Sequence, residues 1–500
     1  MVDTENQDAT DGSGLSSLTE IVEGAGLYVV GRGSSNALGL LTNFILTRIL
    51  GAALYGIYAY VNVVFGIVLV FTKLGGDKAV LRYLPEYSDN PDMQNTMLTI
   101  AYAVSLGASL LVAAIVYLGA PVISFYTLDE PLFVDVLRIT AIVIPFRTLS
   151  TITYAAFKSL SLMEYNVGVS SIARPIMKLV FVGGAVLLGL SIHGAAAGLV
   201  VTGILVFLLG IALLFKKSRL GEFNKPTFEQ TKEYTNFSAP LTFQQLGNFL
   251  YNKVDIIMVG LFLTGSAVGI YNIAVMLTRV LAIPLKGFNQ MFPPIASSLY
   301  HDGESQQLDS IYSTVTRWIF TVALYPALVA ILYSPEILGI FGPDFVRGRT
   351  VLTLFAIAQL TNCAVGPSGF LLMMTDNQYV TLMNQLLSGL LNVVLNFVLI
   401  LEFGFIGAAA ATASVLAGVN VLRVIEIWYL EGLFPYDLTY YKPVAAGLLS
   451  AGLLYLIGFW LDGYYLLVGG GILGGAMFAA MILAFGIEQE DKEMFRSFVS

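Results

Sequence analysis

The sequence predicts an all-helical integral membrane protein of about fourteen transmembrane helices, arranged as two pseudo-symmetric six-helix lobes followed by a C-terminal helix pair. Hydrophobic residues make up 57% of the 500 residues and charged residues only 12%, and the mean hydropathy is +0.79. Apolar runs extend from Gly24 almost to Gly486. Helices satisfy their own backbone in lipid, and the sequence lacks the strand alternation of a membrane barrel.

An internal repeat reveals the two halves. Gly56-Ile57-Tyr58 recurs as Gly269-Ile270-Tyr271, and Gly194-Ala195-Ala196-Ala197 recurs as Gly407-Ala408-Ala409-Ala410, both 213 positions later. The repeat therefore covers a whole multi-helix unit. Membrane proteins built from two such repeats usually move a substrate through the interface between them.

The spans follow from polar and turn-rich breaks between apolar runs of about 20 residues, the length that crosses about 30 Å of hydrocarbon. They are predicted at 24–48, 54–74, 97–118, 132–156, 168–190, 194–215, 237–263, 267–288, 312–334, 348–372, 380–401, 404–430, 441–461 and 464–486. The predicted segments are a disordered cytoplasmic tail (1–20), an N-lobe (21–215), a cytoplasmic linker (216–236), a C-lobe (237–430), the last helix pair (431–486) and a cytoplasmic tail (487–500).

The charges of the tails and loops indicate location and exclude some partners. The first twenty residues lack the basic flank and cleavage site of a signal peptide, so no processing is expected. Most basic loop residues fall on one side of the membrane, with Arg48, Arg138, Arg347 and Arg349 on the other, which predicts both termini in the cytoplasm of a multi-pass cell-membrane protein. A net charge of −8 argues against a nucleic-acid partner.

The sequence favours a transporter over an enzyme. The predicted external segments are too short to hold a catalytic site, and there is no phosphate-binding loop of the G-x-x-x-x-G-K-[ST] type. Cys363 is the only cysteine, and His193 and His301 lie far apart in the sequence. We therefore expect no catalytic residues, no metal and no cofactor.

Cations inside predicted spans are the candidate binding residues. A charge at the bilayer centre costs about 2.5–3.5 kcal/mol on insertion scales, so such residues usually face a cavity or a partner. A guanidinium binds phosphate through a bidentate fork and stays charged, which suits an anionic headgroup. The predicted cationic cavity consists of Arg32, Arg147, Arg174, Lys178, Lys253 and Arg279.

For two of these cations and for one acid, the sequence leaves more than one explanation. Arg174 and Lys178 are four residues apart and share a helix face, so they cannot neutralise each other. Snorkelling to the lipid headgroups is a competing explanation for them, but the repeat places leucines at the matching positions, Leu387 and Leu391. Asp255 either forms an ion pair, with Arg279 as the candidate partner, or binds a coupling cation.

Several stretches resemble the polysaccharide flippase family of the MATE-like exporter superfamily, over about residues 20 to 486. They are Arg48-Ile49-Leu50-Gly51, Tyr55-Gly56-Ile57-Tyr58, Arg82-Tyr83-Leu84-Pro85-Glu86-Tyr87, the run from Leu390 to Ile400 and the run from Phe403 to Thr412. The resemblance implies two six-helix lobes around a cavity that opens alternately to either side. It also implies that the basic residues of the first and eighth helices, here Arg32 and Arg279, face that cavity.

The sequence and the resemblance together predict a flippase for a lipid-linked oligosaccharide on a polyprenyl or dolichyl phosphate or pyrophosphate carrier. Its role would be cell-surface polysaccharide or glycoprotein assembly, with membrane lipids and glycosyltransferases as further candidate partners. One alternative is a cation-coupled exporter of small amphiphiles, with Asp255 as the ion site. The other is a non-transporting membrane scaffold for glycan assembly.

Overall fold

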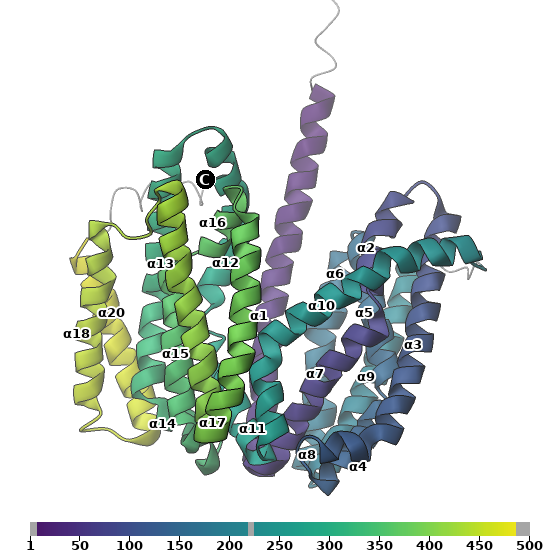
Figure 1. Cartoon of the computed structure of the whole chain (residues 1–500), viewed down its shortest axis with the longest axis horizontal. Helices are drawn as coiled ribbons and strands as arrows, with labels where there is room; N and C mark the ends of the chain where they lie inside the picture. The colour runs from purple at the N-terminus through teal and green to yellow at the C-terminus, as the bar shows by residue number, and fades with distance from the viewer. Residues whose placement is uncertain (1–7, 219–224, 487–500) are drawn as a thin grey trace, which may run out of the picture. The chain divides into compact units, whose positions relative to one another are not determined.

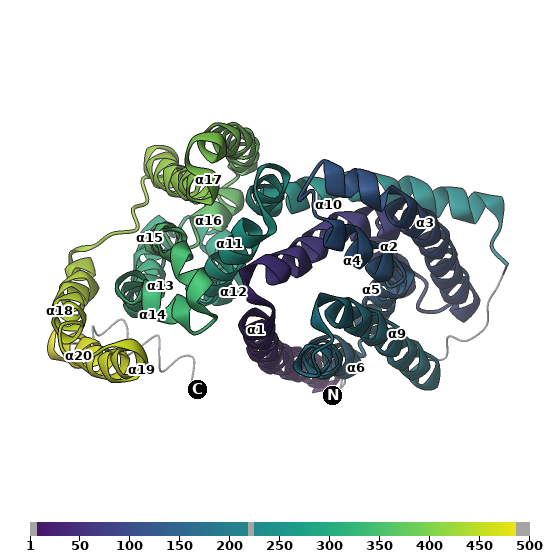
Figure 2. The same ribbon diagram turned by 90° about the horizontal axis from the view of Figure 1, so that it is seen from below.

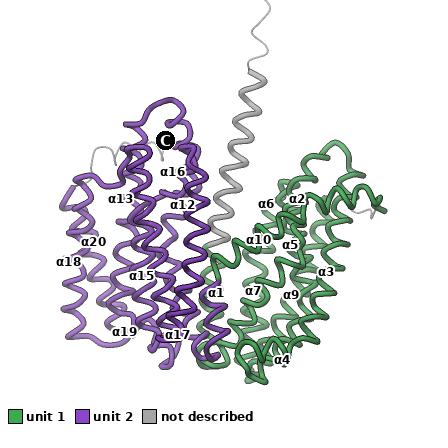
Figure 3. The backbone as a smooth tube through the Cα atoms, viewed as in Figure 1, with its two compact units in different colours: residues 1–253 green, residues 254–500 purple. Residues whose placement is uncertain are grey.

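The computed structural model describes residues 8–218 and 225–486, with side chains from residue 33 onward. The described residues form helices and no strands, which confirms the predicted all-helical class. They fall into two compact units, residues 1–253 (unit 1) and 254–500 (unit 2), shown in Figures 1 and 3. Helix α1 begins at Asp8, within the segment predicted as a disordered tail.

Unit 1 contains the first nine α-helices, two π-helical turns and most of α10. Its elements are α1 (Asp8–Lys73), α2 (Gly76–Glu86), α3 (Pro91–Phe125), α4 (Pro131–Ala141), α5 (Ile144–Ser159), α6 (Met163–Val167), η1 (Gly168–Ala173), α7 (Arg174–Lys178), η2 (Leu179–Gly183), α8 (Gly184–Leu187), α9 (Ser191–Lys217) and α10 (Phe228–Phe262). The elements from α6 to α8 form one continuous helical span, Met163–Leu187. The last residues of α10 belong to unit 2.

Unit 2 continues with α11 (Gly265–Thr278), α12 (Ile283–His301), α13 (Ser305–Leu332), α14 (Ser334–Gly339), η3 (Pro343–Gly348), α15 (Arg349–Ala364), α16 (Ser368–Met374), α17 (Gln378–Glu431), η4 (Leu438–Tyr440), α18 (Tyr441–Ile457), α19 (Gly463–Tyr465), η5 (Leu466–Gly470) and α20 (Gly471–Ala484). Helices α18 and α20 lie side by side and pack against α13 (Figure 2). The helices at the predicted C-terminal pair therefore belong to unit 2 and pack on its α13.

Two of the longest helices are hairpins that fold back at a glycine. In α17, Asn384 Nδ2 donates to Glu426 Oε2 at 2.6 Å, so residues 42 positions apart meet. The reversal lies at Gly404, where φ is +60° and ψ is −140°. Helix α1 reverses in the same way at Gly51, where φ is +70°. Glycine tolerates these angles because it has no Cβ.

The number of fourteen spans stays a prediction. Nine described helices are long and apolar enough to cross a membrane, or ten if the bent pair α11 and α12 is one span. The hairpins α1 and α17 each hold two of the predicted spans. The predicted span 132–156 is divided between α4 and α5, of 11 and 16 residues, which are each too short to cross alone.

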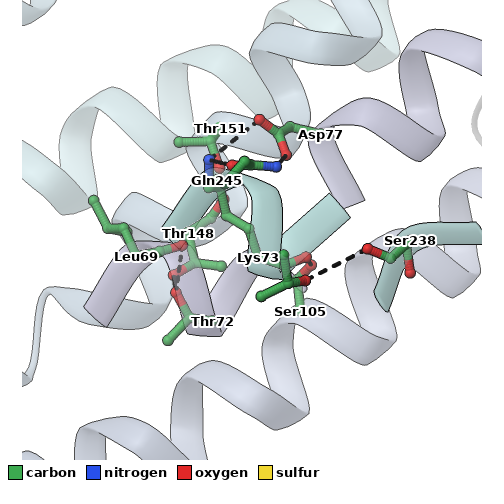
Figure 4. Close-up of polar contacts among 10 residues, drawn as sticks. Leu69, Thr72, Lys73, Asp77, Ser105, Thr148, Thr151, Ser238 and Gln245 are labelled. Atoms are coloured by element: carbon green, nitrogen blue, oxygen red, sulfur yellow. Dashed lines mark hydrogen bonds and ion pairs between the residues drawn. The ribbon is translucent and has the colours of Figure 1, made fainter. Parts of the chain in front are cut away.

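A polar cluster fastens the first part of α10 to unit 1 (Figure 4). Lys73, at the end of α1, donates to Gln245 of α10 at 2.8 Å and pairs with Asp77 of α2 at 3.2 Å. Gln245 Nε2 also donates to Asp77 Oδ1 at 3.2 Å, which closes a triangle. At the same junction Gly75 has φ +69°, and a Cβ there would lie 2.1 Å from the Ser238 carbonyl oxygen.

We therefore expect Gly75→Ala to destabilise unit 1 by more than about 2 kcal/mol, because it adds a backbone clash to left-handed strain. Gly51→Ala adds no clash, but its φ of +70° and ψ of 179° fall in a region that is essentially restricted to glycine, so we expect a cost of about 1–3 kcal/mol from strain alone. Gly107→Ala, inside α3 with nothing within 4 Å of its added Cβ, is the neutral control. Thermal unfolding of the three variants in detergent tests this order, and equal melting temperatures for Gly75→Ala and Gly107→Ala would contradict it.

Candidate functional site

The second limb of α1 supplies an aromatic wall inside unit 1. Tyr58 and Phe65 are seven residues apart, so they lie on one face of the helix, two turns from each other. Both are buried, with 3% and 1% of their surface exposed. Their rings are the contact surfaces for two of the predicted cations.

Those cations come from α5 and α7. The Arg147 guanidinium carbon lies 5.5 Å from the centre of the Phe65 ring, and Lys178 Nζ lies 5.6 Å from that of Tyr58. Arg174 precedes Lys178 by one turn, and its charge is close enough to that of Arg147 for the two to repel each other. Contact with a ring face stabilises a cation by about 0.5–2 kcal/mol without neutralising it.

The three residues Arg147, Arg174 and Lys178, here named the cation cluster, carry uncompensated charge. Within the described residues, none of them lies within 4.0 Å of a carboxylate oxygen. Arg174 is exposed, while Arg147 and Lys178 are half-buried. A concentration of positive charge next to apolar helices is suited to an anionic group that enters from outside the protein.

The backbone around α7 departs from a regular helix on both sides. The π-helical turns η1 and η2 flank its five residues, and Pro175 occupies its first turn. Pro175 has no amide hydrogen to donate, and a π turn widens the helix by one residue. π turns of this kind often mark functional sites.

The other predicted cations are placed elsewhere. Lys253 is half-buried on α10 and is the last residue of unit 1. Arg279 belongs to unit 2 and is exposed in the break between α11 and α12, where the helix axis bends by 53°. It was expected well inside one span, 267–288, but the helix ends just before it and restarts with Pro284 in its first turn. The side chain of Arg32 lies outside the described residues.

Unit 2 has a buried acid with a neutral partner. Asp255, 8% exposed, accepts a hydrogen bond from Tyr271 Oη at 2.8 Å. No ion pair joins Asp255 to Arg279 among the described residues. The phenol also contacts Thr412, which donates to Asn392 Oδ1 at 3.2 Å. Asn396 Nδ2 donates to the same Asn392 oxygen at 2.7 Å, so α10, α11 and both limbs of α17 share one polar network.

Sequence reasoning identified the charged residues but missed their neutral partners. Tyr58, Phe65 and Tyr271 carry no signal as single residues in a chain with this many aromatic residues. The repeat did carry a signal, because Tyr58 and Tyr271 end the two copies of Gly-Ile-Tyr. The partner of each tyrosine comes from another helix, which the local pattern does not show.

Solved structures define the class of fold. The lipid II flippase MurJ in an inward closed conformation matches with a TM-score of 0.70 and 16% identity, over 95% of this chain and 100% of that chain. An inward-facing multidrug resistance MATE family transporter of the MOP superfamily matches with a TM-score of 0.62 and 13% identity, over 79% and 94%. At these identities the likeness establishes the fold alone, which is the predicted MATE-like fold.

The chain belongs to the polysaccharide biosynthesis protein family, whose profile matches residues 21–299, more than half of its length. It is 30% identical over 309 residues to the "Probable low-salt glycan biosynthesis flippase Agl15" of Haloferax volcanii, covering 58% of this chain and 62% of the relative. The "Probable flippase AglR" of the same organism is 27% identical over 195 residues, 35% and 37% of the two chains. The match thus spans less than two thirds of either relative.

The Asp255 network leads to a prediction about stability. Tyr271→Phe removes the hydroxyl that donates to the buried carboxylate, and an unsatisfied buried acceptor of this kind costs about 1–3 kcal/mol. We expect a lower melting temperature in detergent. Tyr379→Phe, on a tyrosine of unit 2 that is 77% exposed, is the control. If the two variants unfold at the same temperature, the hydrogen bond contributes nothing to stability.

Proposed function

We propose that the protein is a flippase that moves a lipid-linked oligosaccharide from the cytoplasmic to the outer leaflet of the cell membrane, for cell-surface polysaccharide or glycoprotein biosynthesis. The observation that carries this proposal is the cation cluster, which has no carboxylate within 4.0 Å among the described residues. The family and the flippases named among its relatives support the same function. Both termini would lie in the cytoplasm, as the basic loop residues indicate.

The cluster would bind the phosphate or pyrophosphate that joins the sugar to its polyprenyl or dolichyl carrier. Guanidinium groups donate to phosphate oxygens in pairs, while Lys178 acts as a point charge. Arg32, Lys253 and Arg279 would contribute further positive charge, and the polyprenyl tail would stay in the lipid. Alternating access would expose the bound headgroup first to one side and then to the other. Such a cycle needs no covalent chemistry on the protein.

We expect Arg147→Ala to slow protein-dependent flipping of a fluorescent lipid-linked oligosaccharide in proteoliposomes by roughly tenfold or more, because a charge-assisted hydrogen bond contributes about 1.5–3 kcal/mol. Arg138→Ala is the matched control, since Arg138 also lies beside an aromatic ring, 5.9 Å from the centre of Tyr117, but is outside the cluster. Equal flipping by the two variants at equal reconstitution would contradict the assignment. Absence of protein-dependent flipping by the unchanged, folded protein would instead favour a scaffold that does not transport.

Asp255 supports a second candidate function, cation-coupled export of small amphiphiles. It is a buried acid whose described hydrogen-bond partner, Tyr271, is neutral, so its charge is available to a cation. The same carboxylate would serve as the coupling site if the flippase itself uses an ion gradient.

In either case Asp255→Asn should abolish the acceleration of transport by an imposed sodium or proton gradient, because the amide cannot carry the negative charge. Transport of the fluorescent glycolipid and of a small amphiphilic dye, each with and without a gradient, separates the two functions. An Asp255→Asn protein that still responds to both gradients would exclude Asp255 as the coupling site.

A further inference from the structure

The internal repeat places Tyr58 of unit 1 and Tyr271 of unit 2 at equivalent positions. Both are buried, with 3% and 0% of their surface exposed. In unit 2 the phenol has an oxyanion as its partner, because Tyr271 Oη donates to the Asp255 carboxylate at 2.8 Å. Unit 2 thus shows what a tyrosine at this position of the fold can bind.

Unit 1 has lost that acceptor. The residue equivalent to Asp255 is Thr42, and its hydroxyl donates to the Leu38 carbonyl oxygen at 2.8 Å. Tyr58 Oη is buried and makes no hydrogen bond to any described residue. An unsatisfied buried hydroxyl costs about 1–3 kcal/mol. Folding alone therefore gives no reason for a hydroxyl here, and phenylalanine would pack as well.

Tyr58 has a positive charge beside it, whereas Tyr271 has the acid Asp255. Lys178 Nζ lies 5.6 Å from the centre of the Tyr58 ring, whereas the equivalent residue in unit 2 is Leu391, 50% exposed. A second phenol, Tyr154 on α5, also has a buried hydroxyl without a hydrogen bond among the described residues. Tyr154 follows Arg147 by seven residues on α5, so the two lie on the same face of that helix, two turns apart. Two neutral donors thus accompany three cations.

We propose that Tyr58 Oη and Tyr154 Oη donate hydrogen bonds to the phosphate oxygens of the ligand held by the cation cluster. The ligand oxyanion then takes, in unit 1, the role that the Asp255 carboxylate has in unit 2. This inference rests on the proposed function and adds specificity to it. A carboxylate has two oxygens, too few for five donor groups, while a phosphate or pyrophosphate has more. The donor set therefore selects phosphorylated amphiphiles over fatty acids.

The test uses Tyr58→Phe, which keeps the ring under Lys178 and removes only the hydroxyl. The purified full-length protein in detergent is titrated with farnesyl pyrophosphate, farnesyl phosphate and palmitate, and its melting temperature is measured without ligand. We expect Kd for the two phosphorylated probes to rise roughly tenfold, the effect of losing one hydrogen bond to a charged group. The melting temperature should stay the same or rise, because an unsatisfied hydroxyl is removed.

Tyr55→Phe is the matched control on the same helix. Its hydroxyl already has a protein partner, because it donates to Asn43 Oδ1 at 3.1 Å. This variant should bind the probes as the unchanged protein does and lose some stability. Tyr154→Phe should weaken binding in the same way as Tyr58→Phe.

The outcomes distinguish a failure of the proposed tyrosine role from a failure of the proposed flippase function. If Arg147→Ala loses affinity for farnesyl pyrophosphate and Tyr58→Phe does not, the tyrosine role is overturned and the flippase proposal stands. A drop in melting temperature for Tyr58→Phe, with unchanged Kd, would make the hydroxyl structural and would also overturn it. If the unchanged protein binds neither phosphorylated probe, or binds palmitate equally well, the phosphate site itself is refuted.

Discussion

Hydrocarbon offers no hydrogen-bond partner to the backbone, and this constraint governs the architecture of the chain. Every crossing segment must satisfy its own amides and carbonyls, which only helices do without closing a barrel. The direction of the chain can therefore change only where a residue tolerates a non-helical backbone. Gly51 and Gly404 do so within the hairpins α1 and α17. Close packing of the reversed limbs follows, since a Cβ on Gly407 would lie 1.9 Å from the Leu399 carbonyl oxygen.

The same constraint applies to charged side chains, and the two units meet it differently. Unit 2 gives its buried acid a phenol and then a chain of hydroxyl and amide groups, so the oxygen of the acid is hydrogen-bonded. Unit 1 places its cations against aromatic rings and irregular backbone. The matching leucines in unit 2 show that the shared helical framework does not require these cations. The proposed binding of an anionic headgroup would account for their presence in unit 1.

The sequence alone predicted the features that depend on composition and local pattern. Apolar run length predicted the helices, the breaks between predicted spans fell at or beside both hairpin turns, and the cost of intramembrane charge singled out Arg147, Arg174 and Lys178. It did not predict the features that depend on how the helices pack. The break at Arg279 depends on how α11 and α12 bend, and the π turns beside α7 depend on neighbouring helices. Tyr271, the partner of Asp255, lies on the next helix, and Tyr58, the partner of Lys178, is 120 residues away, so both pairs became visible only in three dimensions.

The aromatic partners of the cations in unit 1 would affect the release of a bound phosphate as much as its binding. A carboxylate beside Arg147 would neutralise it, and an incoming phosphate would then have to displace an internal ion pair. An aromatic ring instead lowers the cost of the charge while leaving its field intact. In the proposed cycle, a phosphate would bind without breaking protein contacts, and on leaving it would return the cations to a tolerable environment. A carrier needs this balance, because a site that binds its cargo too tightly stops the cycle.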